Sequence, residues 1–293
     1  MLSKELLRKI RKIEISASRL VSEQLAGRYH SVFKGRGMAF SEVREYFAGD
    51  DVRSIDWNVS ARMNRAHIKL FAEERDRTVI LVVDMSASGL FGSQEQSKRE
   101  VAAEMAAMVA FSAIANGDRV GLIMFSDQIE LYVPPKKGKK HVLRVIRELL
   151  SFEPVSGRTN VTVGLEYLSR VMKRRCVAFL LSDLLTDDWL KPVRMISRRH
   201  DLVPVLLSDP LEFEMPNVGL VVVQDLETGT LVEFDTGGQG ALRYREQMAK
   251  AGAQRAMDLR RLKLDFVQVR TDESHIDALV QFFRRRERRM QHV

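Results

Sequence analysis

Stretches of continuous apolar residues alternate along this chain with stretches whose apolar residues recur every three or four positions. The most regular apolar run is Val79–Val83, which holds mostly β-branched residues and no polar position. Such a run is typical of a strand that is covered on both faces, as in the middle of a parallel sheet. Because strand and helix patterns then keep alternating, the sequence predicts an α/β fold with a doubly wound, mostly parallel sheet flanked by helices.

The expected elements can be placed by residue number. Strands are expected at 67–73, 78–84, 119–126, 176–181, 202–207 and 264–269, with an edge strand at 128–135 that stops at two prolines. Helices are expected at about 4–26, 97–115, 140–151, 161–173, 187–200 and 239–261, and from residue 274 onwards. The segments 218–223 and 231–234 flank a short polar turn and predict a hairpin.

We expect two parts: an N-terminal helix with a small β and loop extension over residues 1–75, and the main α/β domain over residues 76–293. Within the first part, residues 43–62 show neither a helical nor a strand period. One interpretation is a network of ion pairs around Trp57, and the other is a docking surface, since Trp and Arg are frequent interface anchors. The charged residues concerned are Arg44, Arg53, Arg62, Asp50, Asp51 and Asp56.

Polar residues follow the predicted central strand at the point where its apolar run ends. Asp84, Ser86 and Ser88 occupy alternate positions there, at the carboxyl end of a buried strand, where open α/β sheets form their ligand crevice. Three oxygen donors of this kind suit Mg²⁺ or Mn²⁺. The same pattern is also common in turns and helix N-caps, so these three residues alone leave both interpretations open.

Two later segments supply similar groups. Thr159 lies in a loop just before the helix expected at 161–173, and Asp183 follows the strand expected at 176–181. A second buried strand therefore delivers a carboxylate at its carboxyl end, which strengthens the metal-site interpretation.

Composition and charge narrow the classes of function. The net charge of +8 suits an acidic or membrane-surface partner but also a merely basic surface, and the cluster Arg284–Arg289 has no interleaved aromatic residues. Nucleic-acid binding is therefore not expected. The single cysteine, Cys176, is expected to be a buried small hydrophobe, and it excludes an internal disulfide and a cysteine-based zinc site. With a charged N-terminus and no bilayer-length apolar run, we expect a cytoplasmic protein without a transmembrane segment.

Taken together, Asp84, Ser86, Ser88, Thr159 and Asp183 resemble the metal-ion-dependent adhesion site of the von Willebrand factor A domain. The segment Gly49–Trp57, with Ala61-Arg62 just before the first strand of the sheet, also resembles the signature of a bacterial A-like family of unknown function. Members of that family are commonly encoded beside MoxR-type AAA+ ATPases. The resemblance extends from about residue 30 to the end of the chain, and it implies a von Willebrand factor A-like fold.

The resemblance also implies roles for the residues. Ser86 and Ser88, and Thr159 in the ligand-competent state, would bind Mg²⁺ through their hydroxyls, with Mn²⁺ or Ca²⁺ as alternatives. Asp84 and Asp183 would act largely through water. An Asp or Glu of a partner protein would complete the coordination. Arg158 departs from the family pattern, because a small residue is more usual beside the threonine.

The function implied is that of a non-enzymatic, metal-dependent adaptor that binds a protein client, together with a MoxR-type ATPase, in the assembly or remodelling of complexes. A metal-assisted hydrolase and a scaffold with a vestigial metal site are the alternatives. The hydrolase is disfavoured because Asp-x-Ser-x-Ser lacks the second carboxylate of an aspartyl-phosphate phosphatase, and no histidine lies within the site segments.

Overall fold

The structure is a computed structural model, and it describes residues 4–21, 25–33, 38–73, 77–186 and 188–291. The chain divides into two compact units, one formed by residues 1–32 and 77–293 and the other by residues 33–76. Within the described residues, no helix is both long enough and apolar enough to cross a membrane.

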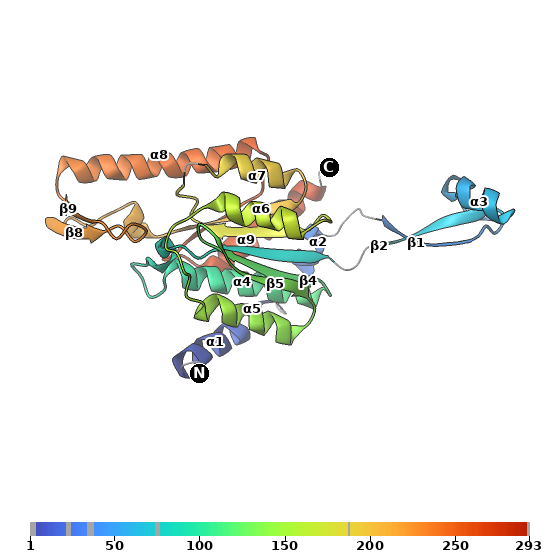
Figure 1. The fold of residues 1–293 in the computed structure, drawn as a ribbon, viewed down its shortest axis with the longest axis horizontal. Helices are drawn as coiled ribbons and strands as arrows, with labels where there is room; N and C mark the ends of the chain where they lie inside the picture. Colours follow the sequence, from blue (N-terminus) through green and yellow to red (C-terminus); the bar gives the residue numbers. More distant parts are fainter. Residues whose placement is uncertain (1–3, 22–24, 34–37, 74–76, 187, 292–293) are drawn as a thin grey trace. The chain divides into compact units, whose positions relative to one another are not determined.

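The larger unit is built on a six-stranded sheet (Figure 1). Its strands are β3 (Thr78–Asp84), β4 (Arg119–Phe125), β5 (Ile129–Lys136), β6 (Val177–Ser182), β7 (Asp201–Ser208) and β10 (Val267–Arg270). They lie in the order β10-β7-β6-β3-β4-β5. All neighbours pair in parallel except β5, an edge strand that runs antiparallel to β4. The predicted fold class, a mostly parallel sheet flanked by helices, is confirmed.

The strand order reverses direction at one point. From β3 the chain moves outward through β4 to β5, and it then returns to the other side of β3 to add β6, β7 and β10. The switch point therefore lies between β3 and β6, which pair from Val79↔Val177 to Val83↔Leu181. In open α/β sheets, the crevice beyond the carboxyl ends of two such strands is the usual ligand site.

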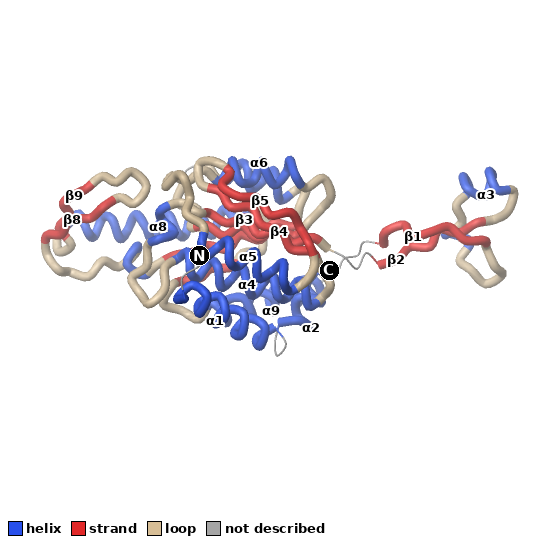
Figure 2. The backbone as a smooth tube through the Cα atoms, turned by 60° about the horizontal axis from the view of Figure 1, so that its bottom comes forward, coloured by secondary structure: helices blue, strands red, loops and turns tan. Residues whose placement is uncertain are grey.

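Helices cover both faces of the sheet (Figure 2). The helices of this unit are α1 (Lys4–Leu20), α2 (Ala26–Phe33), α4 (Lys98–Ala115), α5 (Lys139–Ser151), α6 (Val161–Val171), α7 (Leu190–Ser197), α8 (Gln239–Arg261) and α9 (His275–Gln291). Helices α4, α5 and α9 pack on one face, and α6 and α7 pack on the other. This two-sided cover explains the unbroken apolar run of β3, whose residues from Val79 to Val83 are all buried.

The predicted division at residue 75 groups the N-terminal helix with the extension. In the structure, this helix belongs to the larger unit instead. Helix α1 packs against α4 and α5, and ion pairs join Lys9 to Glu100 at 2.6 Å and Glu14 to Lys139 at 2.8 Å. The apolar side of α1 is thus used to cover α4 and α5, which sequence periodicity cannot specify. The smaller unit ends at residue 76.

The smaller unit is an antiparallel pair of strands, β1 (Met38–Glu45) and β2 (His67–Glu73), with η2 (Val52–Ser54) and α3 (Trp57–Met63) between them. The predicted ion-pair network exists in part: Arg44 and Asp50 form two hydrogen bonds of 2.7 and 2.8 Å. Asp56 instead caps α3 and pairs with Lys69 at 3.2 Å. Trp57 is 69% exposed, so it is not the buried centre of the network, and the docking interpretation stays open.

A second antiparallel pair, β8 (Leu220–Gln224) and β9 (Leu231–Asp235), forms the predicted hairpin. It follows η4 (Pro210–Glu212) and precedes α8. The hairpin lies beyond the end of the sheet where the parallel strands finish, in both views (Figures 1 and 2). Its turn therefore reaches the edge of the sheet that contains the switch point.

Candidate functional site

The site starts at the end of β3, where the backbone leaves the sheet and the polar residues begin. Asp84 accepts a hydrogen bond of 3.0 Å from the Ser86 amide through Oδ1 and one of 2.8 Å from the Ser182 hydroxyl through Oδ2. Ser182 is the last residue of β6. The two strands at the switch point are thus joined through the Asp84 carboxylate, which fixes its position.

Ser86, Ser88 and Asp183 form a chain of hydrogen bonds beside Asp84. The Ser86 and Ser88 hydroxyl oxygens are 3.1 Å apart, and the Ser88 hydroxyl donates to Asp183 Oδ2 at 2.9 Å. Ser86 and Asp183 are buried, whereas Ser88 is partly exposed. The structure therefore brings together four of the five residues expected at the site: Asp84, Ser86, Ser88 and Asp183.

Thr159, the fifth residue, lies in an adjoining loop and has a different partner. The backbone amide of Ala87 donates to the carbonyl of Gly157 at 2.9 Å, which places the loop of Thr159 beside the loop of the two serines. The Thr159 hydroxyl itself donates to Glu227 Oε1 at 2.7 Å. Glu227 belongs to the turn between β8 and β9, so a third segment of the chain closes this side of the site. The neighbouring Arg158 side chain is exposed.

A lysine that the sequence reasoning missed lies against Asp183. The Lys98 ammonium is 2.7 Å from Asp183 Oδ2 and also pairs with Glu212 of η4. Lys98 is only 1% exposed. Burial by itself lowers the pKa of Lys98, but the two carboxylates outweigh burial and raise it, so the ammonium stays charged.

The two carboxylates of the site have opposite electrostatic environments. Burial would raise the pKa of Asp183, but the Lys98 charge and the Ser88 hydroxyl outweigh it and hold that pKa below its usual value. The hydrogen bonds described for Asp84 come from neutral groups. Burial, followed by the negative charge of Asp183, raises the pKa of Asp84 to about 6. Asp84 therefore carries a negative charge that a bound cation would stabilise.

The available donors are consistent with a hard divalent cation. They are the hydroxyls of Ser86, Ser88 and Thr159 and the carboxylates of Asp84 and Asp183, all oxygen ligands of the kind that Mg²⁺ prefers. Across the described residues, no group of three or more His, Cys, Asp or Glu side chains is placed to hold a metal. A cation site here would therefore depend on hydroxyls, with Asp84 and Asp183 supplying the charge.

Of the two residues that the sequence pattern did not predict, Lys98 stands in a recognisable pattern and Glu227 does not. Lys98 stands at helical spacing with Val101, Met105 and Met108, three residues of the apolar face of α4, and a charge on an apolar face indicates a buried partner. Glu227 occupies a hairpin turn, where an acidic residue is ordinary. Nothing in the sequence links it to Thr159, because their contact spans 68 positions.

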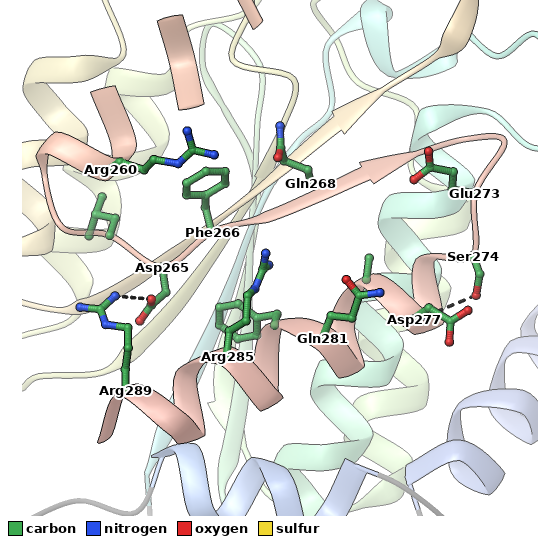
Figure 3. Close-up of a pocket in the computed structure, with 13 residues that line it drawn as sticks. Arg260, Asp265, Phe266, Gln268, Glu273, Ser274, Asp277, Gln281, Arg285 and Arg289 are labelled. Carbon is green, nitrogen blue, oxygen red and sulfur yellow. Dashed lines mark hydrogen bonds and ion pairs between the residues drawn. The ribbon is translucent and has the colours of Figure 1, made fainter. Parts of the chain in front are cut away.

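A separate pocket lies at the outer edge of the sheet, between β10, the end of α8 and α9 (Figure 3). It encloses about 590 Å³ and is lined by three arginines, Arg260, Arg285 and Arg289, and three acids, Asp265, Glu273 and Asp277. Arg289 pairs with Asp265, and Arg260 stacks on the Phe266 ring. Because the charges balance, the lining favours neither an anionic nor a cationic ligand.

The fold and the polar cluster define a class of protein, a doubly wound α/β protein whose candidate ligand site occupies the switch point of its sheet. The chain belongs to a family described as proteins of unknown function, DUF58, whose model matches residues 42–257. It is similar to the uncharacterized protein Rv1480 of Mycobacterium tuberculosis, with 32% identity over 286 residues that cover 95% of this chain and 89% of that protein. The uncharacterized protein YeaD of Bacillus subtilis is 23% identical over 189 residues, 63% of this chain and 43% of YeaD.

Solved structures with some likeness include the conserved hypothetical protein BatB from Bacteroides thetaiotaomicron. It has 15% identity and a TM-score of 0.46, and the match covers 72% of this chain and 99% of that chain. The SpRpn10 VWA domain matches with 13% identity and a TM-score of 0.40 over 70% of this chain and 94% of its own. At these scores, the class stated above depends on the strand pairings of this chain alone.

Proposed function

We propose that this protein is a non-enzymatic binding module that uses a divalent cation, Mg²⁺ in the first instance, to hold an acidic side chain of a protein partner. The observation that carries the proposal is the meeting of Asp84, Ser86, Ser88 and Asp183 at the switch point of the sheet. Hydroxyl ligands add no charge of their own, so a cation bound among them keeps affinity for an outside carboxylate.

The geometry also argues against a hydrolytic use of the serines. In the described part of the chain, no histidine lies among the hydrogen-bond partners of Ser86, Ser88 or Thr159. Lys98 is held charged by two carboxylates, so it is not a general base. The Ser88 hydroxyl donates to Asp183, whose pKa is lowered, which makes Asp183 a weak base.

Titration of Mn²⁺ and Mg²⁺ into metal-stripped protein by calorimetry tests the proposal. We expect saturable binding to the unsubstituted protein that is lost in Ser86→Ala and retained in Ser151→Ala. Ser151 is a suitable control because it is exposed at the end of α5, and its hydroxyl donates to the Arg147 carbonyl of the same helix. Equal heats for the two variants would contradict the assignment, and turnover of phosphate esters in the presence of Mg²⁺ would favour the hydrolase.

A scaffold with a vestigial metal site is the second candidate, and Lys98 is the observation that favours it. Its ammonium already supplies a positive charge to Asp183 at 2.7 Å, as a bound cation would. The scaffold predicts that partner binding persists in EDTA and in Asp84→Ala. The adaptor predicts that both treatments abolish it.

We further propose that the adaptor works with a MoxR-type AAA+ ATPase in the assembly or remodelling of protein complexes. The support is the resemblance of the Gly49–Trp57 segment to the signature described above. In the structure this segment is exposed at Val52 and Trp57, at 59% and 69%, and the nearby Phe47 is 64% exposed. Co-purification of the two proteins from cells that express both, and its loss in Trp57→Ala, would test the partnership.

A further inference from the structure

The contact between Thr159 and Glu227 places a carboxylate of this chain against one of the candidate cation ligands. Glu227 Oε1 accepts the Thr159 hydroxyl at 2.7 Å. Thr159 is one of the candidate cation ligands, and an acidic side chain is the ligand that a partner is proposed to supply. The hairpin therefore presents the same chemical group to the same loop from inside the molecule.

Hydrogen bonds within the turn and packing against the neighbouring loops position Glu227 for this contact. Asp225 Oδ1 accepts the amides of Glu227 at 2.8 Å and Thr228 at 3.1 Å, which fixes the backbone of the turn. A side chain on Gly157 would meet Ala87 Cβ at 3.3 Å and the Leu226 carbonyl oxygen at 3.7 Å. The turn thus packs directly on the two loops that carry the serines and Thr159.

The remainder of the hairpin is exposed on one side and anchored at its base. Leu220, Val222 and Leu231 are 71%, 64% and 65% exposed, so one side of the arm is uncovered. Its base is anchored, because the Thr236 hydroxyl donates to the Gly219 carbonyl at 2.7 Å and β9 packs on α8. Among the described contacts, the packing near Gly157 and the bond from Thr159 to Glu227 join the turn to the loops of the site.

We propose that Glu227 is an internal acidic ligand of the candidate site, which an acidic partner must displace before it can bind. This inference rests on the proposed function and adds a regulation to it. A negative carboxylate at Thr159 repels a second one, and a charge-assisted hydrogen bond of this kind changes an equilibrium by about tenfold. The apparent affinity for an outside carboxylate equals the intrinsic affinity multiplied by the fraction of molecules in which the turn is open.

The test compares Glu227→Gln, at a partly buried position, with the control Glu233→Gln, which removes an exposed charge from β9 of the same hairpin. Protein loaded with Mn²⁺ is titrated with acetate, and the relaxation of the acetate methyl protons reports its approach to the paramagnetic ion. We expect half-saturation at about tenfold lower acetate in Glu227→Gln than in the unsubstituted protein, and no change in Glu233→Gln.

Hydrogen exchange on the unsubstituted protein gives a readout that needs no variant. With Mn²⁺ present, acetate should accelerate exchange of the Glu227 and Thr228 amides, because their bonds to Asp225 open more often once the bond from Thr159 no longer restrains the turn. Mn²⁺ binding with identical acetate curves for all three proteins, or no acetate effect on exchange, would overturn the internal ligand and leave the proposed function standing. Absence of Mn²⁺ binding from all three would overturn both.

Discussion

Replacing Lys98 by methionine tests the electrostatic structure of the site most directly. The substitution keeps the length of the side chain and removes the ammonium that lies 2.7 Å from Asp183 and also pairs with Glu212. Two carboxylates are then left without their cation, and the exposed fractions of their side chains are only 6% and 12%. Breaking a buried pair by removal of one partner typically costs about 3–5 kcal/mol.

We take the lower end of that range, since Glu212 is the more exposed partner and can recover some hydration. A loss of about 3 kcal/mol corresponds to a fall of about 6–12 °C in Tm for a unit of this size. The assay is urea unfolding followed by circular dichroism, with Lys250→Met as the control, because Lys250 is exposed on α8. The double variant Lys98→Met with Glu212→Gln should regain part of the lost stability, because only one of the two carboxylates is then left charged and unpaired.

The same variant connects stability to the proposed cation. Without the ammonium, Asp183 gains more from a divalent ion, so Mg²⁺ should stabilise Lys98→Met more than it stabilises the unsubstituted protein. Equal unfolding midpoints for Lys98→Met and Lys250→Met would refute the reasoning, because they would mean that loss of the ammonium leaves no costly unpaired charge at Asp183 and Glu212.

Three further predictions concern other buried positions of the larger unit. Gly164→Ala places a Cβ 2.6 Å from the Phe125 ring, so we expect a loss of about 1–3 kcal/mol. Gly240→Ala meets nothing within 4 Å and should be neutral or stabilising in the same urea assay, and equal effects would contradict the overlap. Hydrogen bonds outweigh burial and lower the pKa of Asp209 from 3.8. The ionised carboxylate should therefore stabilise the folded protein above pH 3.8, and this contribution should be lost as the pH falls through the lowered pKa. Acid unfolding should be less steep in Asp209→Asn, and an unchanged profile would contradict this. Burial raises the pKa of Cys176 to about 12, so a thiol reagent should label it only after unfolding by urea, and rapid labelling of native protein would contradict its burial.

Much of the larger unit follows from local patterns in the sequence. The uninterrupted apolar run before Asp84 is long enough to identify a strand covered on both faces, and the Ser97 cap and Asn116-Gly117 mark the ends of α4. The sequence also predicts that the polar residues after β3 and β6 lie close together. Parallel strands finish at one edge of the sheet, so Asp84 and Asp183 are brought to one place once both strands are identified.

The extension shows where local pattern fails. Met38–Glu45 mixes charged and apolar residues without alternation, and it forms β1 only because β2 pairs with it from Glu45↔His67 to Met38↔Glu73. Helix α1 similarly shows an apolar side in its sequence but no indication that α4 and α5 cover it. In both cases the partner determines the structure, and the partner is distant in the chain.

The sequence by itself therefore determined the class of fold, the strand that carries Asp84 and the kinds of oxygen donor that gather at its end. Tertiary structure alone decided what those donors contact. Lys98 and Asp183 are 85 positions apart and Thr159 and Glu227 are 68 apart. Contacts at such separations depend on strand order and on where a hairpin returns, and no periodicity in the chain records either, because hydrophobic pattern fixes which face is buried and not what covers it.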